Sequence, residues 1–103
     1  MYKICFYVPE NAMELVKQAV FDAGAGRVGD YDSCCWQTKG TGQFRPLDNS
    51  HPHIGQQGRL ETVSEYKIEM ICDDKNIRQA IDALKQSHPY EEPAYDVWRL
   101  EDF

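Results

Sequence analysis

The feature that most constrains the fold of this chain is a strand pattern that leads directly into a helix pattern, and it occurs twice. In the first copy, residues 2–8 alternate in polarity, so that Ile4, Phe6 and Val8 share one face of a strand. Apolar residues then recur at helical spacing between residues 13 and 23. The first copy therefore predicts a strand followed by a helix.

Local signals mark both ends of this first helix. Asn11 is the expected N-cap, and Glu14, three residues later, completes a capping-box pattern. Gly24 and Gly26 are expected to end the helix, because glycine readily adopts the left-handed conformation found at helix C-termini.

The second copy begins with a strand predicted for residues 62–72, and its helix has an apolar stripe between residues 77 and 84. One face of this strand is apolar and the other is charged, as in a sheet with one solvated face. Asp73 or Asp74 is the expected cap of the helix. The apolar face carries Tyr66, Ile68, Met70 and Cys72, and the charged face carries Glu65, Lys67 and Glu69.

Two further strands complete the order of elements. Their apolar and aromatic content predicts them at residues 31–38 and 94–100. The resulting order predicts one α+β domain over residues 1–103 with a ferredoxin-like βαββαβ fold. In that fold, four antiparallel strands carry both helices on one face of the sheet.

The other face of this sheet is then without helices, and we expect it to carry many aromatic side chains. Such a face is suited to contact between subunits. The alternative is that the same side chains pack under the helices or under a long loop. The aromatic residues concerned are Tyr2, Tyr31, Trp36, Tyr95 and Trp98.

Composition disfavours some classes of partner and indicates where in the cell the chain is expected. Its formal net charge of -6 disfavours nucleic acid and anionic membranes as main partners, because both need a basic surface. No signal-peptide pattern and no apolar run of about 20 residues are present. The 4 cysteines lack CxxC spacing and are expected to be reduced thiols. Together these features predict a soluble, cytoplasmic domain.

A long loop is predicted from about residue 39 to residue 60, and it is rich in Gly, Pro, Asn, Ser and His. Its glycines allow close approach of the backbone to a ligand, and consecutive N–H groups in such a turn can hold an anion. The alternative is a hairpin tip whose glycines only set the geometry of the turn. The candidate anion-binding residues are Lys39, Gly40, Gly42, Arg45 and Arg59.

The same loop contains two histidines that are candidate metal ligands. His51 and His53 would project from one side of an extended segment, and a His-x-His pair can ligate a metal. A metal site needs further ligands, and only Asp48 is near in sequence. Solvated or hydrogen-bonded histidines are the favoured interpretation, so we expect no cofactor, and a divalent metal at this pair is the alternative.

Residues 88–96 read His-Pro-Tyr-Glu-Glu-Pro-Ala-Tyr-Asp and follow the second predicted helix. This segment resembles the corresponding segment of the CutA proteins and of the CutA-like domain inserted in Nif-three-like (YqfO-like) proteins. The resemblance to the inserted domain covers essentially the whole chain. The matching pieces are residues 2–4, 8–10, 23–26, 40–46 and 54–55, with Gly29, Tyr31, Gly58, Glu61, Glu65, Ile68 and Glu69.

This resemblance implies a PII/CutA-like version of the ferredoxin-like fold, and trimers formed by pairing sheets edge to edge. Larger Nif-three-like proteins carry a dimetal site in their main domain. We expect this chain to be the inserted domain alone, without the flanking domain that supplies the metal ligands. We therefore do not expect this chain to have the hydrolase activity of the larger proteins.

His88, Glu91 and Glu92 could act as acid, base or ligand in the 88–96 segment. Small-ligand or metal binding by PII-like and CutA-like proteins makes His88 and Glu91 candidate ligand-binding residues. The alternative is a structural role, since adjacent carboxylates on a strand would point to opposite faces. No nucleophile and base can be paired among nearby residues, so we expect no catalysis.

Three functions are compatible with these sequence features. The favoured one is a small homo-oligomeric binding or regulatory module, a trimer or a dimer, that senses a small anion or a metal ion at a subunit junction. The first alternative is a structural protein that docks on a larger partner protein. The second, disfavoured alternative is a metal-dependent, hydrolase-like enzyme.

Overall fold

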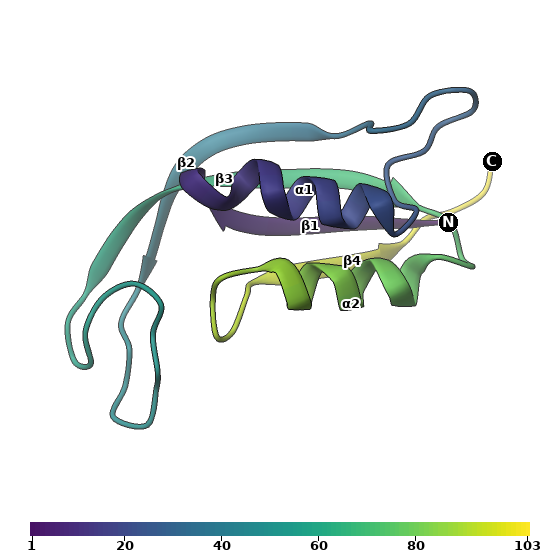
Figure 1. Ribbon diagram of the computed structural model, residues 1–103. Helices are drawn as coiled ribbons and strands as arrows, with labels where there is room; N and C mark the ends of the chain where they lie inside the picture. Colours follow the sequence, from purple (N-terminus) through teal and green to yellow (C-terminus); the bar gives the residue numbers. More distant parts are fainter.

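A computed structural model describes all residues from Met1 to Phe103. Its four strands form one antiparallel sheet in the order β2-β3-β1-β4, and both helices lie on the same face of it (Figure 1). This confirms the predicted α+β, ferredoxin-like arrangement. The elements in chain order are β1 (Tyr2–Pro9), the short 3-10 helix η1 (Glu10–Ala12), α1 (Met13–Asp22), β2 (Trp36–Phe44), β3 (Glu61–Cys72), α2 (Ile77–Ser87) and β4 (Tyr95–Arg99).

The core lies between the helices and the apolar face of the two central strands. Phe6 pairs with Ile68 across β1 and β3, and both side chains are fully buried. The helices cover them with Val16, Val20 and Leu84, which have no exposed surface. Each such side chain contributes roughly 1.5–3 kcal/mol when it leaves water. The alternation read from the sequence is thereby confirmed for both central strands.

The first helix begins later than the sequence predicts. Asn11 lies inside η1, and the N-cap position of α1 belongs to Ala12, whose side chain makes no capping hydrogen bond. The predicted capping box with Glu14 is therefore wrong, because a 3-10 turn after Pro9 carries the chain past it. The predicted end is correct: Gly24 follows α1 with φ 109°, a conformation that favours glycine.

The second helix has Asn76 at its N-cap position, so neither Asp73 nor Asp74 is the cap that the sequence predicts. Asp73 instead accepts a hydrogen bond from the backbone N–H of Asn76 at 3.0 Å, which stabilises the turn before the helix. Neither helix has the length and apolar character needed to cross a bilayer.

The second strand differs most from the prediction. It runs over Trp36–Phe44, whereas residues 31–35 form no strand and include Ser33 at φ 56°. The predicted loop start at residue 39 is therefore wrong, and the loop covers residues 45–60. Most of this strand is exposed, so no buried face imposes an apolar alternation on it.

β2 and β3 continue beyond the rest of the sheet as a two-stranded arm. β1 pairs with β3 only as far as the Pro9–Glu65 pair, whereas β2 pairs with β3 as far as Phe44–Glu61. Figure 1 shows the arm extending past the ends of both helices and curving toward the level of α2, with the 45–60 loop at its end. The arm therefore brings this loop near the segment that follows α2.

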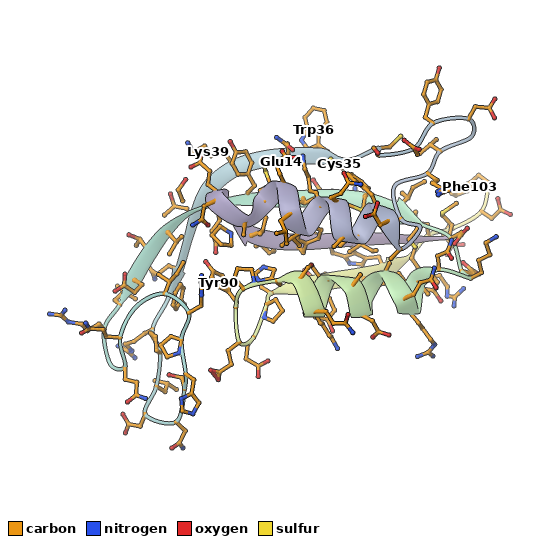
Figure 2. All side chains as sticks on the ribbon, in the orientation of Figure 1. Glu14, Cys35, Trp36, Lys39, Tyr90 and Phe103 are labelled. Carbon is orange, nitrogen blue, oxygen red and sulfur yellow. The ribbon has the colours of Figure 1, made fainter.

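Two of the five aromatic residues expected on the sheet face opposite the helices lie there. Strand register places Trp36 and Trp98 on this face, where 69% and 48% of each residue is exposed. Figure 2 shows Trp36 projecting outward from β2. Tyr2 and Tyr95 pair in register with core residues, so they lie on the helix side, and Tyr31 lies in a loop.

All four cysteines are free thiols. Cys5 and Cys72 are buried, and burial raises the pKa of Cys72 to about 11. Cys34 and Cys35 are half-buried and lie before β2, not in a strand as the sequence suggested. Two of the four thiols, Cys5 and Cys72, are thus buried within the protein.

Candidate functional site

A cavity of about 510 Å³ lies where segments far apart in sequence meet. The end of the β2–β3 arm and the 45–60 loop form one side of it, and residues 90–94 form the other. Figure 2 shows Tyr90 between α2 and the arm. The volume falls within the range of about 300–1,000 Å³ that is common for small-molecule sites.

A buried tyrosine–carboxylate pair forms the inner wall of this cavity. The Tyr90 hydroxyl donates to Glu65 Oε2 at 2.7 Å, and only 9% of Glu65 is exposed. Burial, followed by the bond to Glu65, raises the pKa of Tyr90, so its hydroxyl stays protonated as the donor. The Phe44 ring packs against Tyr90 at a centroid distance of 5.9 Å.

Gly42 provides the space that the Glu65 carboxyl group occupies. A Cβ atom at Gly42 would overlap with Glu65 Oε1, whereas a Cβ at Gly40 would meet no atom within 4 Å. Neither glycine has a positive φ, so the requirement at Gly42 is one of space and not of backbone conformation.

His88 fastens the segment after α2 to the end of β1. The backbone N–H of Tyr90 donates to His88 Nδ1 at 3.1 Å, so the proton of the neutral ring lies on Nε2. Nε2 in turn donates to the carbonyl oxygen of Tyr7 at 2.7 Å. Burial lowers the pKa of His88, which is only 6% exposed. The ring thus has a structural role beside the cavity.

Glu91 connects the two sides of the cavity. Its Oε2 accepts a hydrogen bond from the backbone N–H of His51 at 2.6 Å. The 45–60 loop is also held by its own contacts, since Gly58 N–H donates to the Pro46 carbonyl at 2.7 Å. Residues 88–94 form no strand, so Glu91 and Glu92 both line the cavity and do not point to opposite faces as expected.

The structure brings together some of the residues that the sequence singled out and separates others. Gly42, Arg45, His53 and Glu91 line the cavity, and His88 lies directly behind it. Lys39 and Gly40 lie at a smaller hollow of about 340 Å³, and Arg59 lines neither space.

The anion-binding turn predicted around Gly40 and Gly42 is wrong. Both residues lie within β2, paired with β3, and neither has the left-handed conformation of an anion-binding turn. Lys39 is 3.7 Å from Glu10, so its charge is already paired.

The two loop histidines do not come together with further ligands. Nowhere in the chain do three or more His, Cys, Asp and Glu side chains lie in a group that could hold a metal ion. His53 lines the cavity, whereas His51 takes part through its backbone N–H.

The sequence did not reveal Glu65, Tyr90 and Phe44 as site residues. The sequence pattern places Glu65 on the charged, solvated face of its strand, and no pattern marks Tyr90 or Phe44 as site residues. The signal that could have found them is Gly42 in β2, which lies diagonally across from Glu65 once Gly40 is paired with Glu65 in β3. That alignment is a long-range register, which local patterns do not specify.

We predict that Gly42→Ala destabilises the protein and that Gly40→Ala does not. The new Cβ at position 42 displaces the Glu65 carboxyl group from Tyr90, and losing a buried hydrogen bond of this kind costs about 1–3 kcal/mol. Urea unfolding of both variants measures the difference. Equal stabilities for the two variants would show that Glu65 moves aside without cost.

We also predict that acid weakens the fold through His88. The folded state keeps this ring neutral, whereas the unfolded chain takes up a proton near pH 6.5. The free energy of unfolding should therefore fall by up to about 1.4 kcal/mol per pH unit as the pH drops below that value. Urea unfolding between pH 7.5 and 5.5 tests this.

The variant His88→Gln should show a flatter pH dependence over this range. His51→Gln is the matched control, since the His51 side chain is exposed and only its backbone N–H makes a hydrogen bond, so this variant should leave the slope unchanged. A slope that persists in His88→Gln would contradict the assignment.

Comparison with known proteins places this chain among much longer ones. No family model matches it. It is 44% identical over 100 residues to the "GTP cyclohydrolase 1 type 2 homolog" of Halalkalibacterium halodurans, and the match covers 97% of this chain and 27% of that protein. The chain therefore spans about a quarter of the length of the curated relatives it matches.

Solved structures agree with the sequence matches. The Bacillus cereus protein related to NIF3 superposes with a TM-score of 0.82 at 40% identity, over 98% of this chain and 26% of that one. CutA from Xylella fastidiosa superposes with a TM-score of 0.69 at 20% identity, over 99% of this chain and 85% of CutA, which shows a shared fold. The fold and these similarities together identify the chain as a PII/CutA-like domain of the kind found within NIF3-like proteins.

Proposed function

We propose that this chain is a self-associating binding module that holds a small ligand in the cavity between the 45–60 loop and residues 90–94. The observation that carries the proposal is the cavity itself, with aromatic walls at Phe44 and Tyr90 and a few polar groups among them. Small-molecule sites usually have this composition. A ligand in the cavity would affect the 45–60 loop and residues 88–94 together, because the Glu91–His51 hydrogen bond links them across the cavity.

Self-association is the second part of the proposal. Trp36 and Trp98 are exposed on the sheet face without helices, and aromatic side chains are enriched in the centres of protein interfaces. The same face carries Lys3 and Lys67 beside Glu69, so opposite charges are available to a second copy. A trimer is the expected assembly from the resemblance to CutA proteins, with a dimer as the alternative. The cavity would then lie at or near a junction between subunits.

Docking on a larger partner protein is a second candidate function. The observation in its favour is that the relatives are longer chains in which this domain makes up about a quarter of the length. In this case the open sheet face would contact another polypeptide. The activity named for the relatives is that of chains of which this domain makes up about a quarter, and it is not proposed for this domain.

A ligand screen tests the binding proposal. Nucleotides, inorganic phosphate, divalent metal chlorides and small amines are each added to the full chain, and thermal unfolding is followed. A ligand at 100-fold excess over its Kd stabilises the folded state by about 2.7 kcal/mol. Amide resonances of cavity residues should shift with the same ligand. If no compound in the whole screen stabilises the protein, the proposed binding function is contradicted.

Mass measurement in solution tests self-association. We expect sedimentation equilibrium to show a discrete oligomer, and we expect Trp98→Ser to weaken it by about tenfold in Kd or more, as loss of a central aromatic contact does. Leu15→Ser is the matched control, because Leu15 is 65% exposed on α1, in the layer on the other side of the sheet. A monomer at all concentrations would favour the partner-docking function instead.

A further inference from the structure

The inner wall of the cavity holds a carboxylate with one unused oxygen. Glu65 is 9% exposed, and its Oε2 accepts from Tyr90 while its Oε1 has no hydrogen-bond partner within the chain. Every fully buried side-chain nitrogen and oxygen in the structure has a partner. Oε1 is therefore in contact with solvent at the wall of the cavity, where it lies against Gly42.

No positive charge of the chain is paired with this carboxylate. The nearby lysines are used elsewhere, since Lys39 pairs with Glu10 and Lys67 lies 4.0 Å from Glu69. A buried carboxylate without a counter-ion is costly, because it has lost much of its hydration without gaining an ion pair. A ligand that brings a positive charge to Oε1 would remove this cost.

The rest of the cavity also favours a positively charged ligand. Glu65, Glu91 and Glu92 line it together with one guanidinium, that of Arg45. Glu91, Glu92 and Arg45 are all exposed and screened by solvent, so the buried Glu65 is the charge that matters most to a ligand. The Tyr90 hydroxyl already donates to Glu65 Oε2, so the group that remains for a ligand at this point is a hydrogen-bond acceptor, Glu65 Oε1. The rings of Phe44 and Tyr90 would contact the apolar part of a ligand, and aromatic faces attract cations.

We infer that the cavity binds a small organic cation, an ammonium or guanidinium group on an apolar body, whose charge is recognised by the Glu65 carboxylate. A bare metal ion fits less well, because the chain assembles no group of three metal-ligating side chains. A simple anion fits less well because carboxylates outnumber the guanidinium around the cavity. The inference rests on the proposed function and names the chemical class of its ligand.

The test uses three compounds of similar size and different charge: benzylamine, benzyl alcohol and benzoate. Each is titrated at neutral pH into the ¹⁵N-labelled full chain, and amide shifts are followed. Benzylamine should bind at least about tenfold more tightly than the other two, as expected for a charge-assisted hydrogen bond. The largest shifts should fall on the amides of Gly42, Phe44 and Tyr90.

Two variants assign the preference to one side chain. Glu65→Gln keeps an oxygen that can accept from Tyr90 but removes the charge, and it should lose the tenfold preference. Glu69→Gln is the matched control, since Glu69 lies on the same strand and face but outside the cavity, and it should retain the preference. The comparison of the three compounds on the unaltered chain remains decisive if Glu65→Gln does not fold.

The outcomes separate the two proposals. If benzyl alcohol or benzoate binds in the cavity as tightly as benzylamine, the inference of a cation site is overturned and the cavity remains a ligand site. If Glu69→Gln loses the preference and Glu65→Gln keeps it, the assignment to Glu65 is overturned. If neither these compounds nor any member of the broad screen binds, the proposed function and the inference fall together.

Discussion

The site depends on a mismatch in length between two paired strands. β3 has 12 residues and β1 has 8, so the first part of β3 extends past the sheet and pairs with β2 alone. This overhang is the arm that carries the 45–60 loop to the segment after α2. Had both strands been of equal length, the loop would end at the edge of the sheet and no cavity would form beside Tyr90. The main-chain hydrogen bonds of the β2–β3 pair, and not side-chain packing, hold most of this arm, since most of β2 is exposed.

The short segment between α2 and β4 closes the other side of the cavity with few side chains. The His88 ring bridges the Tyr7 carbonyl and the Tyr90 amide, which fixes the path of the chain as it leaves the helix. That path directs the Tyr90 hydroxyl onto Glu65. Gly42 completes the arrangement from the arm, because only a residue without a side chain leaves room for the carboxylate. Three elements distant in sequence thereby position one acidic group in an otherwise aromatic wall.

The surface of the domain divides into two areas with different properties. The cavity combines aromatic walls with an excess of carboxylates, which is a chemistry for a small positively charged molecule. The open sheet face combines exposed tryptophans with charges of both signs, which is a chemistry for another polypeptide. The relatives of this domain are several times its length, and that face is where a longer protein or further copies could contact it. Ligand binding and assembly would thus use neighbouring parts of the same small fold, with the cavity at or near the junction between subunits.

The sequence by itself determined the fold class, because the alternation at Ile4, Phe6 and Val8 and the matching face of β3 can be buried only beneath two amphipathic helices. It also pointed to Gly42, Arg45, His53 and Glu91, which the structure gathers around one cavity. Tertiary structure decided the limits of β2 and the role of Glu65. β2 forms by main-chain pairing with both of its faces largely in water, so burial leaves no apolar pattern in it. Glu65 is a buried carboxylate because strand pairing brings Gly42 against it and because His88 positions the segment that places Tyr90 over it. Such long-range pairings are set by the whole fold and not by neighbours in sequence.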